Sequence, residues 1–251
     1  MQLALQELPE DFRPVSLEEI GAVSLPHRVE TKFLLRESRL PELLRMLAGD
    51  YLRLQIGHQH SFRYTTNYFD TGDARLYLDH HNGYLRRMKV RCRRYDATGQ
   101  CFFEIKQKVN AQRSDKMRFA VAGLMEDILT AEQAAEIHYP RLAAQSLCYS
   151  LTSAFRRSSF CDTAFTERMT IDTGITACND RDARAFPGLA LVEIKQNFFS
   201  RSSTAMKALQ RVGAIHSPFS KYALGKALLH PELKRNNFKP LLSLLTKHSF
   251  L

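Results

Sequence analysis

Three segments of the sequence carry a glutamate and a lysine that are separated by one residue, in surroundings typical of β-strands. They are Glu30-Thr31-Lys32, Glu104-Ile105-Lys106 and Glu193-Ile194-Lys195. Successive side chains of a strand point to opposite faces, so each glutamate shares a face with its lysine. Carboxylates in this arrangement can bind a divalent cation, and ammonium groups can bind phosphate.

A fourth strand-like segment, Lys89-Val90-Arg91-Cys92-Arg93, places its cations on one face. Side chains two residues apart on a strand are ~6.5–7 Å apart, and at an effective dielectric constant of 20 two like charges at that distance repel by about 2.4 kcal/mol. Outward-facing, hydrated strands are one explanation for so much like charge. Because the charges recur in register on nearly every predicted strand, we favour an anionic ligand, and phosphate is the anion that arginine and lysine match best.

The charge of the chain is unevenly distributed. The sequence has 251 residues, 44% of them hydrophobic and 25% charged, with a net charge of +10. Residues 1–26 carry a net charge of −4, so residues 27–251 carry +14. This composition is typical of a folded protein. The basic body implies an anionic partner, which could be nucleic acid, a membrane surface or a phosphorylated small molecule.

Other features of the sequence narrow the class of protein. The number of cysteines is odd and no CxxC pair occurs, so a disulfide framework or a zinc site is poorly supported. No apolar run approaches the ~20 residues that span a bilayer, and residues 1–8 lack the features of a signal peptide. We therefore predict a cytoplasmic protein with no transmembrane segment.

The apolar patterns predict strands and a few helices. Strands are expected over 29–35, 61–69, 84–95, 100–109, 116–121, 152–160, 167–173 and 189–197. Helices are expected after the capping box at Ser16, over 40–47, 130–144 and 202–212, and from the cap Ser220 to about residue 230. Asn82-Gly83 and Thr98-Gly99 are turn signals. Together they indicate an α+β fold, with one antiparallel, barrel-like domain decorated with helices.

The glutamates among the basic residues allow two interpretations. Each Glu-x-Lys pair can be a same-face salt bridge, or Glu193, alone or with Glu30, Glu104 or Asp172, can hold a divalent cation that bridges substrate phosphates. Both interpretations stay open from the residues alone. The histidines are expected to lie in solvated loops, with His80 also a candidate for a tunnel mouth; they are His58, His60, His80 and His81.

Nine segments in order resemble the VTC domain (vacuolar transporter chaperone, polyphosphate polymerase domain), a branch of the triphosphate tunnel metalloenzymes. Each is weakly specific alone, and together they cover residues 28–222. The segments are Arg28-Val29-Glu30-Thr31-Lys32, Tyr68-Phe69-Asp70-Thr71, Lys89-Val90-Arg91-Cys92-Arg93, Phe103-Glu104-Ile105-Lys106, Lys116-Met117-Arg118, Phe155-Arg156-Arg157, Arg168-Met169-Thr170-Ile171-Asp172-Thr173, Val192-Glu193-Ile194-Lys195 and Ser220-Lys221-Tyr222.

The resemblance implies an antiparallel eight-stranded β-barrel tunnel with a basic interior that holds triphosphate or polyphosphate. We expect this tunnel domain over residues 27–230, after an acidic segment with a short helix (1–26) and before a basic and apolar tail (231–251). The resemblance also implies a divalent cation, Mn²⁺ or Mg²⁺, held by Glu193. We assign catalytic roles to Lys32, Arg91, Arg93, Lys106 and Lys221, and phosphate binding to Arg28, Lys89, Lys116, Arg118, Arg157, Arg168, Lys195 and Ser220.

The leading functional hypothesis is a polyphosphate polymerase-like transferase that moves the γ-phosphate of ATP to a phosphate or polyphosphate chain. A metal-dependent triphosphatase or polyphosphatase and a non-catalytic module that binds polyphosphate or nucleotide are the alternatives. Nucleic acid is not expected as a partner, because Phe and Tyr are placed mostly on the face opposite the charges.

Two departures from the family limit what carries over. Phe155 stands where the family often has tyrosine. The eukaryotic polymerases are coupled to membrane spans and a phosphate-sensing domain, neither of which this sequence shows, so coupled export is not supported and a membrane or protein partner stays unknown.

Overall fold

A computed structural model describes residues 12–23, 25, 29–109, 114–124 and 147–251 of the chain. The helix expected over 130–144 and the phosphate ligand expected at Arg28 lie outside the described residues. Every strand and every other helix that the sequence predicts is present, with boundaries that shift by a few residues.

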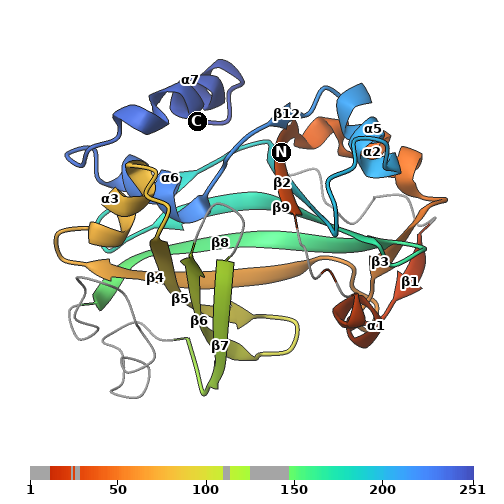
Figure 1. The fold of residues 1–251 in the computed structure, drawn as a ribbon, viewed down its shortest axis with the longest axis horizontal. Helices are drawn as coiled ribbons and strands as arrows, with labels where there is room; N and C mark the ends of the chain where they lie inside the picture. The colour runs from red at the N-terminus through yellow and green to blue at the C-terminus, as the bar shows by residue number, and fades with distance from the viewer. Residues whose placement is uncertain (1–11, 24, 26–28, 110–113, 125–146) are drawn as a thin grey trace.

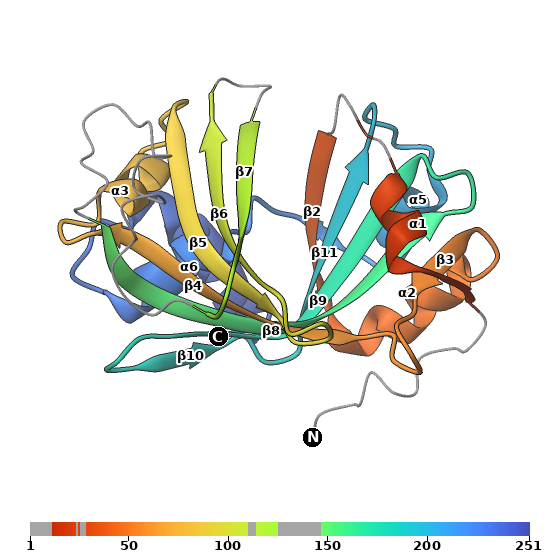
Figure 2. The same ribbon diagram turned by 90° about the horizontal axis from the view of Figure 1, so that it is seen from below.

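The strands form one large sheet (Figures 1 and 2). Its main path runs β12-β2-β11-β9-β8-β4-β5-β6-β7, while β1 pairs with β3, β3 with β8, and β10 with β9. All the pairs are antiparallel except β1 with β3. The strands are β1 (Arg13–Val15), β2 (Val29–Arg36), β3 (Tyr51–Leu54), β4 (Phe62–Thr71), β5 (Arg87–Tyr95), β6 (Cys101–Lys108), β7 (Ser114–Val121), β8 (Leu147–Asp162), β9 (Glu167–Cys178), β10 (Ala183–Ala185), β11 (Leu189–Gln196) and β12 (Ile215–His216).

The sheet is an open trough, so the expectation of a closed eight-stranded barrel is wrong. Within the described residues it has 12 strands, and its path ends at β12 and β7. Figure 2 shows β5, β6 and β7 on one side of the trough and β2, β11 and β9 on the other. Part of the β2 edge that would have to pair with β7 is occupied by β12, which pairs Ile215 with Leu34 and His216 with Phe33. The expectations of an antiparallel sheet and of an α+β fold are confirmed.

Helices cover the ends and the convex side of the sheet (Figure 1). Those expected from capping and spacing are α1 (Leu17–Ala22), α2 (Leu40–Leu47), α5 (Thr204–Arg211) and α6 (Lys221–Leu229). The capping box of α1 forms, because the Ser16 hydroxyl accepts from Glu19 N and the Glu19 carboxylate accepts from Ser16 N. Two more helices have weaker sequence signals, α3 (Arg75–His81) and α7 (Lys239–Lys247).

One of the two turn signals has a different role from the one expected. Thr98-Gly99 does close the hairpin between β5 and β6, with Gly99 at a φ of 67°. Asn82-Gly83 instead ends α3, where Asn82 N donates to the Leu78 carbonyl over 2.8 Å. His80 and His81 therefore lie on a helix rather than in a loop, and His81 accepts a hydrogen bond from Asn237 N.

Apolar side chains on the convex face fix which way the charges point. Phe33, Val192 and Ile194 from β2 and β11 pack with α2 and α5 in one core cluster, and Val90 and Phe103 from β5 and β6 lie in another. These residues alternate with the charged ones, so burying them turns the charged side chains into the trough. The described part of the C-terminal tail is also packed, through Leu245 and Phe250. The strand alternation thus positions the site.

Candidate functional site: a charged trough

Two charged surfaces face each other in the trough. We call the concave side of β5, β6 and β7 the basic wall and the concave side of β2, β11 and β9 the mixed wall. In the basic wall, Lys89, Lys106 and Lys116 are register partners, as are Arg91, Glu104 and Arg118. In the mixed wall, Glu193 pairs with Lys32 and Lys195 with Glu30.

The carboxylate of the basic wall is saturated by cations. Glu104 is only 1% exposed; Arg91 contacts its Oε2 at 2.7 Å, while Lys116 and Arg118 lie 2.5 and 3.7 Å from its Oε1. Burial acts to raise the pKa of Glu104, but Arg91, Arg93 and Lys116 outweigh it and hold that pKa well below the ordinary value. Glu104 therefore serves to hold the basic wall together.

Two cations of the same wall are buried or half-buried without a carboxylate partner in the part of the chain that the structure describes. Arg93 donates through Nε to the Thr66 hydroxyl over 3.0 Å, and burial together with Arg91 lowers its pKa. Lys89 donates to the Ser220 hydroxyl over 3.1 Å, and burial with Lys32 and Lys106 lowers its pKa well below the ordinary value. Both groups would gain from an anion in the trough.

The mixed wall shares its carboxylates more loosely. Lys32 Nζ lies 3.0 Å from Glu30 and 3.6 Å from Glu193, and Lys195 Nζ lies 2.8 Å from Glu193. Burial and the Glu193 carboxylate raise the pKa of Glu30, but the lysines outweigh them and lower it. Burial also acts to raise the pKa of Glu193, but Lys195, Lys32 and Arg157 outweigh it and hold that pKa well below its ordinary value. Two mutually repelling carboxylates thus flank one lysine.

The two walls are close enough to interact through side chains. Lys106 Nζ on β6 lies 3.8 Å from Glu30 Oε2 on β2, and the Lys32 charge acts on Lys89 of the opposite wall. The trough is therefore a single electrostatic compartment, although no ladder among the described strands closes it.

Helix α6 places its first residues in this compartment. Lys221 Nζ lies 2.5 Å from Asp172 Oδ2 and 4.2 Å from the centre of the Phe155 ring. Arg157 holds the same carboxylate with two hydrogen bonds, of 2.5 and 2.7 Å. Burial lowers the pKa of Lys221 to about 8 in spite of Asp172. Ser220 caps the helix by accepting from Ala223 N over 3.2 Å.

The carboxylates differ in their fitness for a metal ion. Asp172 and Glu104 are held by arginine side chains, whereas lysine ammonium groups contact Glu193 and Glu30. Among the described residues, no cluster of three or more His, Cys, Asp or Glu side chains could enclose a metal. Mg²⁺ commonly uses one or two carboxylates together with waters and substrate phosphates. Glu193 with Glu30 fits that chemistry, and the family implies a divalent cation.

Some aromatic rings share the concave face with the charges, although Phe33 and Phe103 lie on the opposite face as expected. The Arg157 guanidinium lies 5.3 and 5.2 Å from the ring centres of Tyr64 and Phe155, and the Arg118 guanidinium lies 3.6 Å from that of Phe102. Strand alternation accounts for Phe102 and Phe155, which lie two residues from Glu104 and Arg157. The rings support the guanidinium groups.

The sequence-predicted site residues that the structure describes lie on the two walls, on β8 between them in the case of Arg157, or at the start of α6. Arg168 is half-buried on β9 opposite Lys195. His80, at the end of α3, was expected only as a candidate for a tunnel mouth, and the charges of Lys89 and Lys32 act on it. Its Nε2 is buried without a hydrogen-bond partner in the described part of the chain, and burial with Lys89 and Arg87 lowers its pKa. Its only sequence signal was its place just before the basic strand.

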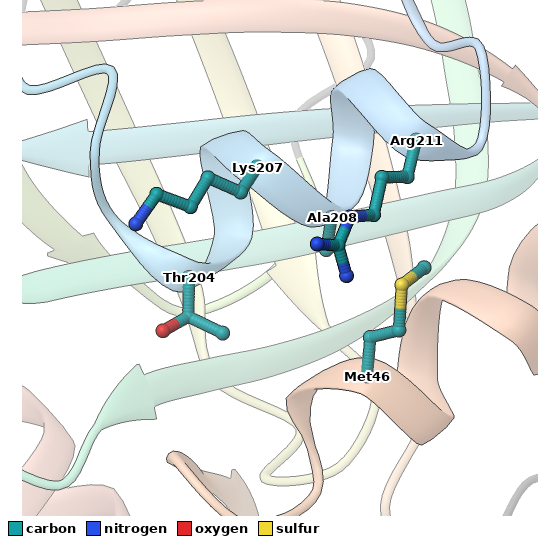
Figure 3. Close-up of a pocket in the computed structure, with 5 residues that line it drawn as sticks. All are labelled: Met46, Thr204, Lys207, Ala208 and Arg211. Carbon is teal, nitrogen blue, oxygen red and sulfur yellow. The ribbon is translucent and has the colours of Figure 1, made fainter.

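A pocket of ≈ 120 Å³ lies outside the trough, between α2 and α5 (Figure 3). Its lining consists of Met46, Thr204, Lys207, Ala208 and Arg211. Lys207 extends away from Arg211 in this view, so the two cations do not converge on one ligand. The trough, where cations from both walls do converge, is the candidate site.

The family comparison agrees with this assignment. A family model described as the VTC domain matches residues 27–230. The chain belongs to the VTC domain family. The VTC match includes β2 to α6 and hence both walls and the Ser220-Lys221 cap. No curated protein matches the chain.

Several solved structures resemble this VTC domain. A candidate adenylyl cyclase from Hippeastrum, reported to have a dominant triphosphatase activity, has 13% identity and a TM-score of 0.49, covering 80% of this chain and 97% of that one. A candidate adenylate cyclase from Vibrio parahaemolyticus has 15% identity and a TM-score of 0.46, covering 79% and 97%. One from Bacillus halodurans has 14% identity and a TM-score of 0.47, covering 77% and 95%. Within the described residues, no helix is long and apolar enough to cross a membrane.

Proposed function

We propose that this VTC domain is a phosphoryl transferase that binds ATP and a phosphate or polyphosphate chain in the trough and passes the γ-phosphoryl group to the chain. Two cations of the basic wall, Arg93 and Lys89, support this proposal most. Among the described residues they form no ion pair with a carboxylate, whereas Arg91 and Lys116 pair with Glu104. Desolvated cations that face one another destabilise a fold unless an anion joins them, and a phosphate chain supplies anions at regular spacing.

The two walls have different tasks in this proposal. Arg91, Arg93, Lys106 and Lys116 bind non-bridging phosphate oxygens along the basic wall, with Lys89, Arg118 and Ser220 beside them. Arg157, Arg168 and Lys195 neutralise the same chain from the opposite side. Catalysis then depends on alignment of the reacting phosphates and on charge stabilisation, so no protein nucleophile is required.

In this proposal Lys32 and Lys221 act on the reacting phosphoryl group, because the charge of the proposed metal carboxylate acts on both. Lys32 lies 3.6 Å from Glu193, and the Glu193 charge also acts on Lys221. A divalent cation held by Glu193 and Glu30 would supply additional charge neutralisation and orient the phosphates. We infer no preference between Mn²⁺ and Mg²⁺.

The decisive experiment separates transfer, hydrolysis and binding. The purified protein is incubated with ATP and a short polyphosphate primer in Mn²⁺ or Mg²⁺, and the products are resolved by chain length. A lengthened primer supports the transferase. Release of free phosphate alone would make the protein a triphosphatase or polyphosphatase, and binding without ATP consumption would make it a non-catalytic module.

A matched pair of variants tests the proposed metal carboxylate. Glu193→Gln should abolish Mn²⁺ binding measured by electron paramagnetic resonance, and should lower turnover at least about 100-fold. Glu42→Gln is the control. It removes a half-exposed carboxylate of α2, on the convex side, that pairs with Arg39, and it should change neither Mn²⁺ binding nor turnover. Equal Mn²⁺ affinity in the wild type and Glu193→Gln would show that the cation binds elsewhere.

A further inference from the structure

Asp70, at the end of β4, has a buried carboxylate that joins two helices. It is 1% exposed, and it accepts hydrogen bonds from Leu76 N and Tyr77 N in the first turn of α3, over 2.8 and 3.0 Å. It also accepts from Thr71 N over 2.8 Å and from the hydroxyl of Tyr222 in α6. One side chain therefore fixes the start of α3 and the start of α6 to the same strand.

Tyr222 connects this carboxylate to the trough. It follows Ser220 and Lys221 directly in the chain, and its ring stacks on Tyr68 with the centres 5.0 Å apart. Tyr68 is the register partner of Arg91 and hydrogen-bonds to it. The Tyr222 side chain thus binds the buried Asp70 through its hydroxyl and stacks its ring on Tyr68, which contacts the basic wall.

Helix α6 needs such an anchor. It has only nine residues, and helices this short are marginal without tertiary contacts. Packing already holds its middle close to β9, because a Cβ added at Gly225 would lie 2.8 Å from Ala177 Cβ. The first turn carries both Ser220 and Lys221, and a rotation of that turn would move their polar atoms in the trough.

We propose that Asp70 and Tyr222 are a pair of positioning residues, which hold the first turn of α6 so that Ser220 and Lys221 face a bound phosphate. This inference rests on the proposed function, since it assigns phosphate binding to Ser220 and Lys221. Neither member of the pair touches the substrate. Their effect on binding passes through Lys221 and Ser220.

A matched control exists on the other side of the sheet. Tyr51 also donates its hydroxyl to a buried carboxylate, that of Glu167, but this pair lies in the convex core cluster with α2 and α5. Tyr222→Phe and Tyr51→Phe each remove one hydroxyl from a buried tyrosine–carboxylate pair. Both should lose stability to urea by a similar amount, so the pair separates loss of positioning from loss of stability.

The measurement is the Kd for inorganic tripolyphosphate by calorimetry, with the full chain. Tyr222→Phe should weaken binding about fivefold to tenfold, Asp70→Asn should do so at least as much, and Tyr51→Phe should leave the Kd unchanged. In the presence of Lys221→Met, the Tyr222→Phe change should have less than a twofold further effect, because its influence passes mainly through Lys221.

Three results would each overturn the positioning role. The first is an unchanged Kd in Tyr222→Phe, and the second is a full additional loss of affinity when Tyr222→Phe is combined with Lys221→Met. The third is an equal loss of affinity in Tyr51→Phe, since a general loss of stability would then explain the effect. If the wild type itself fails to bind tripolyphosphate, the proposed function fails first, so the two failures are distinct.

Discussion

Glu104 on the basic wall and Glu193 on the mixed wall belong to the same Glu-x-Lys pattern but have different surroundings. Glu104 is 1% exposed and contacts Arg91, Lys116 and Arg118, whereas Glu193 is 15% exposed and contacts two lysines. In β2 and β11 the lysine contacts its own glutamate. In β6 it contacts Glu30 across the trough instead.

This difference shows that the sequence pattern alone does not set the role of a carboxylate. A carboxylate enclosed by three cations stabilises the wall, and a metal ion would have to compete with those cations for it. A carboxylate that shares lysines with a second carboxylate can exchange an ammonium for a divalent cation, because the ammonium binds as a point charge. The number of partners supplied by neighbouring strands therefore decides between the two.

The largest expected effect is the loss of stability when the Glu104 carboxylate is removed. Glu104→Gln removes the only carboxylate among the described residues that contacts Arg91, Lys116 and Arg118, so it should lower the free energy of unfolding by about 3–5 kcal/mol. Glu193→Gln should cost about 1 kcal/mol or less, because Glu30 still faces Lys32. Urea unfolding measures both. A Glu193→Gln loss as large as that of Glu104→Gln would contradict the distinction.

The second effect concerns Arg93, the guanidinium of the basic wall that has no carboxylate partner among the described residues. Arg93→Met should weaken tripolyphosphate binding by about 1.5–3 kcal/mol, the value of a charge-assisted hydrogen bond, with little loss of stability. Arg94→Met is the control, because the neighbouring Arg94 is exposed and pairs with Asp96. Titration calorimetry gives both Kd values. Similar losses of tripolyphosphate affinity in the two variants would mean that binding depends on the net charge of the protein and not on the position of Arg93 in the trough.

The third effect is a pH dependence that sharpens the role of α6. Burial lowers the pKa of Lys221 to about 8, so its ammonium is lost as the pH rises through that value. The tripolyphosphate Kd should therefore rise about tenfold between pH 7 and pH 9. In Lys221→Met this part of the rise should disappear, while the titration of the ligand itself remains. Parallel pH profiles for wild type and variant would exclude the assignment.

The smallest effect concerns His80, whose pKa is lowered by burial and by Lys89, Arg87, Lys32 and Lys106. The folded protein keeps this imidazole neutral, while the unfolded chain takes up a proton below about pH 6.5. Stability should fall below that pH, by about 1 kcal/mol at pH 6 for this group, and His80→Gln should remove that part. Urea unfolding at pH 6 and pH 8 tests it, and an unchanged difference between the two pH values in His80→Gln would refute it.

Local chemistry made much of this structure predictable from the sequence. The Ser16 capping box, the stripe of leucines in α2 and the Ser220 cap of α6 depend on neighbours within one turn, and each formed where it was expected. Strand alternation likewise predicted that Lys32, Arg91 and Glu193 point away from the core. These signals are short-range, so they survive without knowledge of the tertiary contacts.

The features that could not be predicted depend on distant contacts. Whether the sheet closes depends on β12, a two-residue strand that occupies part of the edge of β2. Helix α3 follows its N-cap Ala74, a non-glycine residue with a φ of 57°, and its first turn is held by Asp70, which also binds the distant Tyr222. The roles of the site residues remain predictions.

The open edge between β7 and β2 affects how wide the trough can be. In a closed barrel, backbone hydrogen bonds set the spacing of adjacent strands at about 4.7–4.9 Å, and widening the barrel would break a ladder. Here the described walls approach each other through side chains, including Lys106 and Glu30 at 3.8 Å. Contacts of this kind are weak in water and are screened by salt. The bore of this trough is therefore compliant, so its width should respond to ionic strength and to the charge of its contents.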